Sequence, residues 1–130
     1  MSDVQINVDF DSMVEPKVLE DGEYKLEIAS AEVKNSAQGN TYINLRLTCP
    51  DILEAEEIYH IVMLPTGKDP KTDNRFKLQL ASLFEACGKQ LESSFDPEMF
   101  VGEQVWAILK VEEDDTYGKR NRVSRFVKGA

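Results

Sequence analysis

The sequence predicts an all-β domain with one helix, in which five strands form a barrel. Five segments alternate apolar and polar residues with the period of two that is typical of half-buried strands. One further segment, residues 74–87, has apolar residues three, four and seven positions apart, as on one face of a helix. The chain has 130 residues, the size of a single domain, so these elements are expected to share one hydrophobic core.

The first two strands are expected at residues 22–33 and 42–49. In both, apolar residues alternate with polar ones, most regularly in the second. The polar segment 34–40 contains a glycine and is predicted to be the loop between them. Pro50 is expected to end the second strand, because proline has no N–H for a central ladder.

The third strand is expected at residues 57–64, which are rich in β-branched and aromatic residues and are followed by a Pro-Thr-Gly turn. A helix is then predicted at residues 74–87. Asp73 or Asn74 is expected to be its N-cap, and Gly88 is expected to end it.

The last two strands are expected at residues 105–111 and 122–127, where alternation of apolar and polar residues resumes. The intervening residues 112–119 are mostly charged and predict a long hairpin connection. The five strands and the helix therefore follow one another in the order β-β-β-α-β-β.

This element order is that of an OB-fold, a five-stranded barrel whose helix lies between the third and fourth strands. We therefore assign residues 22–130 to one OB-fold domain. Residues 1–21 carry acidic residues throughout and only scattered apolar ones, so they are predicted to form an acidic N-terminal arm.

The composition excludes several function classes. No apolar stretch approaches the roughly 18 residues that cross a membrane, and the N-terminus lacks the features of a signal peptide, so a cytoplasmic protein is expected. Cys49 and Cys87 have no metal-binding or redox spacing and are expected to be buried thiols. No nucleophile with a base, metal cluster or carboxylate pair is recognisable, so we expect no enzymatic activity, metal or cofactor.

The charges are distributed unevenly along the chain. The formal net charge is −9, which disfavours a nucleic-acid ligand for the chain as a whole. From Thr116 onward, however, there are five basic residues and no acidic ones. Salt screens charges over about 10 Å, so this basic strip can bind phosphate although the rest of the molecule is acidic.

Four short motifs carry a resemblance to a known family. They are Gly22-Glu23-Tyr24, the loop 34–40 with Tyr42 beyond it, Ala86-Cys87-Gly88 at the end of the helix, and Asn121-Arg122-Val123. With these motifs, the segment from Gly22 to Lys128 resembles small phage single-stranded DNA-binding proteins of the OB-fold class, which are found among replication and recombination genes.

The resemblance implies sequence-nonspecific binding and protection of single-stranded DNA in phage DNA replication and recombination, in the cytoplasm of the host cell. Such binding uses aromatic side chains that stack on bases and basic side chains that contact phosphates. Many single-stranded DNA-binding proteins end in an acidic tail that recruits partners, whereas this chain ends in Lys128-Gly129-Ala130. The acidic arm is the better candidate for recruiting replication or recombination proteins.

Strand parity indicates the first candidate DNA-binding residues. Tyr42 and Arg46 lie opposite the apolar face of the second strand and are expected to be exposed, with Tyr42 either stacking on a base or covering the barrel rim. Trp106 lies opposite the apolar face of the fourth strand and is expected either to stack or to pack. Tyr59 fits a core or interface position as well as a binding role. Lys34 in the first loop is a further candidate.

The basic strip supplies the remaining candidates. Tyr117, Lys119 and Arg120 are expected in the loop between the fourth and fifth strands, a loop that often closes over single strands in OB-folds. Arg122 follows on the fifth strand. Arg125 has the opposite parity to Arg122, so both can face one ligand only if the strand twists or bulges.

The main alternative is a protein-binding OB module or an acidic adaptor without a nucleic-acid ligand, because one fold supports many functions. Its sign would be an exposed apolar patch. Tyr59, Ile61 and Met63 share one parity of the third strand and could form such a patch or seal a homodimer.

Overall fold

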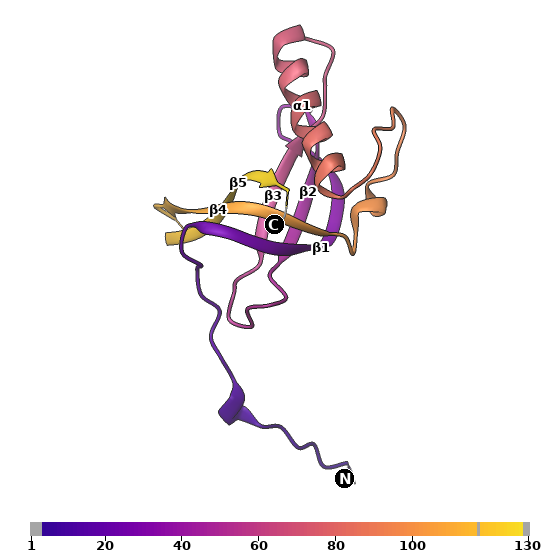
Figure 1. The fold of residues 1–130 in the computed structure, drawn as a ribbon. Helices are drawn as coiled ribbons and strands as arrows, with labels where there is room; N and C mark the ends of the chain where they lie inside the picture. The colour runs from indigo at the N-terminus through magenta and orange to yellow at the C-terminus, as the bar shows by residue number, and fades with distance from the viewer. Residues whose placement is uncertain (1–3, 117, 129–130) are drawn as a thin grey trace.

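The computed structural model describes residues 4–116 and 118–128, and it contains five strands and a helix in the predicted order (Figure 1). The elements are η1 (Phe10–Ser12), β1 (Gly22–Asn35), β2 (Thr41–Thr48), β3 (Ile58–Met63), α1 (Pro70–Ala86), η2 (Pro97–Phe100), β4 (Gln104–Asp114) and β5 (Gly118–Val127), of which η1 and η2 are short 3-10 helices. No helix in the described residues is long and apolar enough to cross a membrane.

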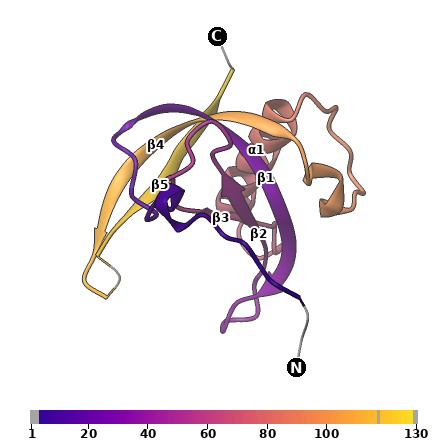
Figure 2. The same ribbon diagram turned by 90° about the horizontal axis from the view of Figure 1, so that it is seen from below.

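All five strands form one antiparallel sheet in the order β3-β2-β1-β4-β5. The central strand β1 changes neighbours along its length: residues 22–27 pair with β4, and residues 27–35 pair with β2. A register shift between Ile28 and Ser30 marks a β-bulge at the changeover, and a bulge bends its strand. The sheet therefore curls around its core (Figure 2).

The curl brings the edge strands β3 and β5 towards each other. The ring of His60 on β3 meets the ring of Phe126 on β5 edge-on, with centroids 5.4 Å apart. Within the described residues no backbone ladder joins β3 to β5. The two strands are therefore joined at this seam by side-chain contacts and not by backbone hydrogen bonds. The predicted order of strands and helix is confirmed, whereas the predicted closure of the sheet into a barrel is not found as a hydrogen-bonded structure.

The inner face of the sheet packs against α1 and η2 in a single core. The largest fully buried side chains are Phe84, Phe100, Leu26, Ile28, Ile43, Leu45, Leu47, Ile58, Leu83, Leu109, Val62 and Val105. Cys49 and Cys87 are buried free thiols, as predicted, and burial raises the pKa of Cys87 to about 11. The alternation that identified the strands is thus the alternation between core and surface.

The helix begins earlier than predicted, at Pro70 rather than Asn74. Proline suits the first helical position, because the N–H that it lacks would have no helical partner there. The predicted N-cap role of Asp73 is wrong. Asp73 lies in the first turn, and its carboxylate accepts hydrogen bonds from the N–H groups of Thr66 and Gly67 at 2.9 and 2.8 Å. It therefore holds the β3–α1 connection against the helix.

Strands β4 and β5 are longer, and their connection is shorter, than predicted. β4 continues to Asp114 and β5 begins at Gly118. The predicted loop positions of Lys119 and Arg120 are therefore wrong, since both residues lie on β5 and pair with β4. Lys34, also predicted in a loop, lies on β1. These strand ends extend beyond the core, so their sequence lacks the apolar alternation of a half-buried strand.

The chain before β1 is anchored at residues 17–19. Leu19 is buried in the core, and the side-chain amide of Asn121 on β5 binds both its N–H and its C=O at 2.8 Å. The core thus includes one residue from the segment that the sequence analysis assigned to the arm. Residues 4–16, the N-terminal extension, are exposed throughout and lead away from the body at the end opposite α1 (Figure 1).

We expect Asn121→Ala to lower the free energy of unfolding by about 2–3 kcal/mol, because it leaves two buried backbone groups of Leu19 without a partner. Urea denaturation followed by circular dichroism measures the change. Asn7→Ala, in the exposed N-terminal extension, is the control and should leave stability unaltered. Equal effects of the two substitutions would contradict the anchoring role of Asn121.

Candidate nucleic-acid interface

The outer face of β1, β2 and β3 brings together several residues that were predicted separately. Directly opposed residues on paired strands point to the same side of a sheet. The strand registers give three rows across this face: Lys34, Tyr42 and Met63; Glu32, Asn44 and Ile61; and Ser30, Arg46 and Tyr59. Tyr59 and Ile61 are 59% and 51% exposed. Aromatic, apolar and basic side chains therefore share one surface.

Glu57, immediately before β3, holds two of these side chains in place. Its carboxylate accepts a hydrogen bond from Arg46 Nη1 at 2.9 Å and one from the Tyr59 hydroxyl at 3.4 Å. Arg46 also donates to the hydroxyl of Ser30 at 3.4 Å. The Arg46 guanidinium is thus already satisfied, so a phosphate would have to compete with Glu57 for it.

A groove of about 350 Å³ runs along the seam between β3 and β5. Tyr59, His60 and Ile61 line it from β3, and Arg120 and Arg122 line it from β5. Burial lowers the pKa of His60 below its usual value, so the imidazole in this groove is neutral at pH 7. The groove connects the outer face of β2 and β3 with the basic residues of β5.

A β-bulge on β5 places Arg125 on the same face as Arg122. Arg122 pairs with Lys110 and Arg125 pairs with Ile108, which leaves Ser124 without a partner on β4. This extra residue resets the alternation, so both arginines lie on the outer face of the sheet. Strict alternation predicted that the two arginines lie on opposite faces. A pattern with a period of two cannot reveal a bulge, so the sequence did not predict this arrangement.

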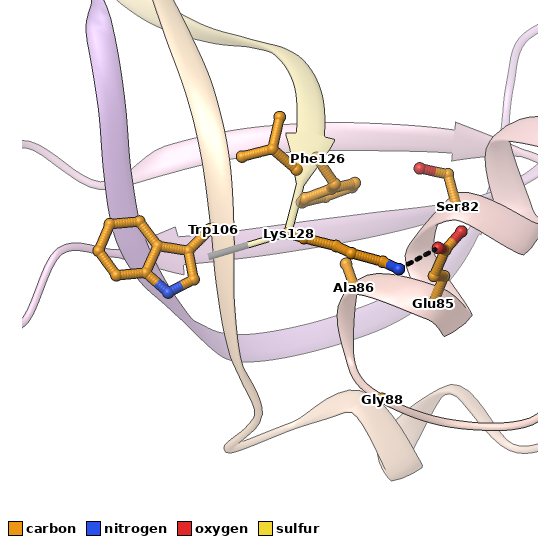
Figure 3. Close-up of a pocket in the computed structure, with 8 residues that line it drawn as sticks. Ser82, Glu85, Ala86, Gly88, Trp106, Phe126 and Lys128 are labelled. Carbon is orange, nitrogen blue, oxygen red and sulfur yellow. Dashed lines mark ion pairs between the residues drawn. The ribbon is translucent and has the colours of Figure 1, made fainter. Parts of the chain in front are cut away.

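Trp106 lies on the outer face of β4, directly opposite Lys25 of β1 and Val127 of β5. It also lines a pocket of about 280 Å³ beside the end of α1. Figure 3 shows its ring and that of Phe126 on opposite sides of β4, and Phe126 pairs with the buried Ala107, on the inner face of the sheet. The indole is half-buried, so one part of it is open to a ligand.

The candidate cations differ in whether a carboxylate neutralises them. Four of the predicted ones are ion-paired: Lys34 with Glu32 at 3.6 Å, Arg46 with Glu57 at 2.9 Å, Arg120 with Asp114 at 3.6 Å, and Arg122 with Glu112 at 3.4 Å. Across the described ranges, Lys25, Lys110, Lys119 and Arg125 form no ion pair. Lys25, Lys110 and Arg125 lie on the outer face of β1, β4 and β5, whereas Lys119 has the parity of the buried Asn121 and lies on the other face.

Taken together, the exposed or half-buried aromatic and basic residues of the outer face form a path across the curled sheet. The path crosses β2, β3, the groove, β5 and β4 in turn. We name it the aromatic–basic band, and its members are Tyr42, Tyr59, Arg120, Arg122, Arg125, Lys110 and Trp106. Arg46 and Lys34 border it but are ion-paired. The predicted candidate Tyr117 lies outside the described residues.

Two comparisons with known proteins bear on the chain. Residues 6–128 match a family that is described as a protein of unknown function (DUF669). No curated protein shows significant similarity to the sequence. The family match spans nearly the whole chain, from the N-terminal extension to the end of β5.

The surroundings of Trp106 predict an unusual response to ionic quenchers. Iodide should quench its emission more strongly than caesium at equal ionic strength, because the cations Lys25, Lys110 and Arg125 on this face outnumber the carboxylates Glu23 and Glu27 that the strand register also places there. The double substitution Lys25→Glu and Arg125→Glu should reverse this order. The same charge change at Lys71 and Lys77, exposed on α1, should not. Caesium quenching the unmodified protein more strongly would contradict the positive potential.

Proposed function

We propose that this chain, which belongs to the DUF669 family, binds single-stranded DNA without sequence preference and protects it during phage DNA replication and recombination. The observation that carries the proposal is the aromatic–basic band, in which three aromatic side chains and four basic ones follow one path across the sheet. The resemblance of the sequence to phage single-stranded DNA-binding proteins supports the biological setting.

The fold supports this proposal as well. Five antiparallel strands in a curled sheet, with a helix between β3 and β4, match the element order of an OB-fold. An OB-fold is a partly open barrel, so an unpaired seam between β3 and β5 is compatible with it. OB-folds bind single strands across their second and third strands, where Tyr42 and Tyr59 lie. We therefore infer that the curled sheet is an OB-type barrel.

The band offers the two kinds of contact that a single strand needs. Tyr59 and Trp106 present ring faces on which bases can stack, and stacking tolerates any sequence because every base has a π-face. Lys110 and Arg125, which have no ion pair among the described residues, are the primary phosphate ligands in this proposal. Duplex DNA hides its base faces, so it should bind more weakly.

Acidic residues beside the band limit how strongly it can bind phosphate. Glu57 and Glu112 line the groove beside Arg120 and Arg122. Exposed ion pairs of this kind contribute only about 0–1 kcal/mol, so phosphate can displace them at small cost, but the carboxylates then remain near the phosphate and repel it. Binding should therefore depend more on stacking than on charge.

A specific observation favours a protein ligand as the second candidate. Tyr59 and Ile61 are both more than half exposed on β3, next to an arginine that is already ion-paired. Exposed apolar residues at a sheet edge suit protein contact. A protein-binding module would bind neither oligo-dT nor duplex DNA, which separates the two candidates in one titration.

Titration with oligo-dT should quench the emission of Trp106, the single tryptophan, and duplex DNA of equal length should bind more weakly. Trp106→Ala should weaken oligo-dT binding by about 1–3 kcal/mol, measured by fluorescence anisotropy of a labelled oligonucleotide. The variant should remain folded by circular dichroism, because the indole lies on the outer face. Equal affinities for single strand and duplex would exclude stacking as the mechanism.

The charge contribution can be measured by the dependence of affinity on salt. Three or four phosphate contacts, at about −0.7 each, predict a log–log slope between roughly −2 and −3. Replacing Lys110 and Arg125 by Glu should weaken binding at least about tenfold and make the slope shallower by about 1.4. Lys71→Glu with Lys77→Glu is the matched control for net charge. Similar losses in both variants would mean that the band does not contact phosphate.

A further inference from the structure

Residues 17–21, between the N-terminal extension and β1, form a segment that we name the strap. It starts on the β3 side of the seam. The N–H of Lys17 donates to the C=O of Glu54 at 2.6 Å, and the C=O of Lys17 accepts from the N–H of Glu56 at 3.1 Å. The side chain of Lys17 adds an ion pair with Glu54 at 3.4 Å. The first residue of the strap is therefore fixed to the chain that leads into β3.

The strap then reaches the other side of the seam. The side-chain amide of Asn121 on β5 binds the N–H and the C=O of Leu19, both at 2.8 Å, and Leu19 is buried in the core. The carboxylate of Asp21 accepts a hydrogen bond from the N–H of Val111 on β4 at 2.7 Å. Extended chain rises about 3.3 Å per residue, so only about 7 Å of strap joins Lys17 to Leu19. This short stretch ties the two sides of the seam together.

The strap and one ring contact hold the seam at two places along the groove. Glu56, which the strap binds, immediately precedes Glu57 in the groove wall, and Asn121 is itself part of the opposite wall. Farther along both strands, the ring of His60 meets the ring of Phe126. Within the described residues no backbone ladder joins the two walls. The separation of the walls at the Glu57 end therefore depends on the strap.

The aromatic–basic band crosses this groove, so the strap acts on the band as a whole. Tyr42 and Tyr59 lie on the β2–β3 side, whereas Arg125, Lys110 and Trp106 lie on the β4–β5 side. A ligand that contacts both sides binds best when their separation is fixed in advance, because ordering them at the moment of binding costs conformational entropy.

We propose that the strap is the positioning element of the nucleic-acid interface. It holds β3 and β5 at the separation at which one single strand contacts Tyr59 on one side of the groove and Arg122 on the other. The identity of this ligand rests on the proposed function, whereas the effect of the strap on the groove needs no ligand. A short oligonucleotide held by Lys110 and Arg125 does not cross the groove, so its binding is independent of the strap.

Spin labels test the effect on the groove without nucleic acid. Labels on Tyr59→Cys and Lys119→Cys report the distance between β3 and β5 by double electron–electron resonance, and Cys49 and Cys87 are buried and should not be labelled.

Lys17→Pro should lengthen and broaden the distance distribution, because proline lacks the N–H and its ring would collide with the C=O of Glu54. Lys17→Gln loses the same charge but keeps the N–H, so it is the matched control and should leave the distribution nearly unchanged. Identical distributions in the two variants would overturn the proposal.

The dependence of affinity on oligonucleotide length tests the effect on binding. Labelled oligo-dT of about 4 and about 12 nucleotides lies within the range that one OB-fold covers, and only the longer one can cross the groove. The unmodified protein should bind the longer one at least about tenfold more tightly in fluorescence anisotropy. Lys17→Pro should remove most of this gain and leave the affinity for the shorter one unchanged, whereas Lys17→Gln should keep the gain.

Two results would overturn the positioning role: a gain that persists in Lys17→Pro, or equal losses for both lengths, which indicate a general loss of structure. Circular dichroism checks that the variants are folded. If the unmodified protein binds neither length, the proposed function fails, and the spin-label distances still decide whether the strap sets the separation of β3 and β5.

Discussion

The structure depends on the sharing of one strand between two ladders. β1 pairs with β4 through residues 22–27 and with β2 through residues 27–35, and the two sets of pairs meet at Glu27. Both ladders can be kept only if β1 bends, and the bulge after Ile28 supplies the bend. Because β2 and β4 follow the two halves of β1, the sheet encloses Leu26 and Ile28, and the outer strands β3 and β5 become neighbours.

The unpaired seam is the direct consequence of this curl, and it determines what the outer surface can do. A flat sheet would place Tyr59 on β3 and Arg122 on β5 at opposite edges, since three strands separate them. In the curled sheet both line one groove. Among the described residues, the same seam leaves backbone groups of β3 without a ladder on that side, and the packing of His60 on Phe126 joins the two strands instead.

Electrostatics at this surface follows local placement more than net charge. The molecule carries a formal charge of −9, yet the bulge at Ser124 gathers Arg122 and Arg125 on one face beside Lys110. Carboxylates neutralise the arginines nearest the groove, whereas Lys110 and Arg125 form no ion pair among the described residues. The free positive charge of this surface is therefore local, at Lys110 and Arg125 on its outer face.

The sequence by itself determined the strands, the helix and their order, because alternation and helical spacing reflect contacts between each segment and one core. It predicted a later start for α1, because Asp73 resembles an N-cap but instead binds the β3–α1 connection. It also predicted a loop at Lys119 and Arg120, because these residues of a solvent-exposed hairpin lack apolar alternation. Only the tertiary structure decided the open seam, the shared face of Arg122 and Arg125, and the ion pair of Arg46 with Glu57. These features arise when strands far apart in the chain pair in a particular register, which no local pattern specifies.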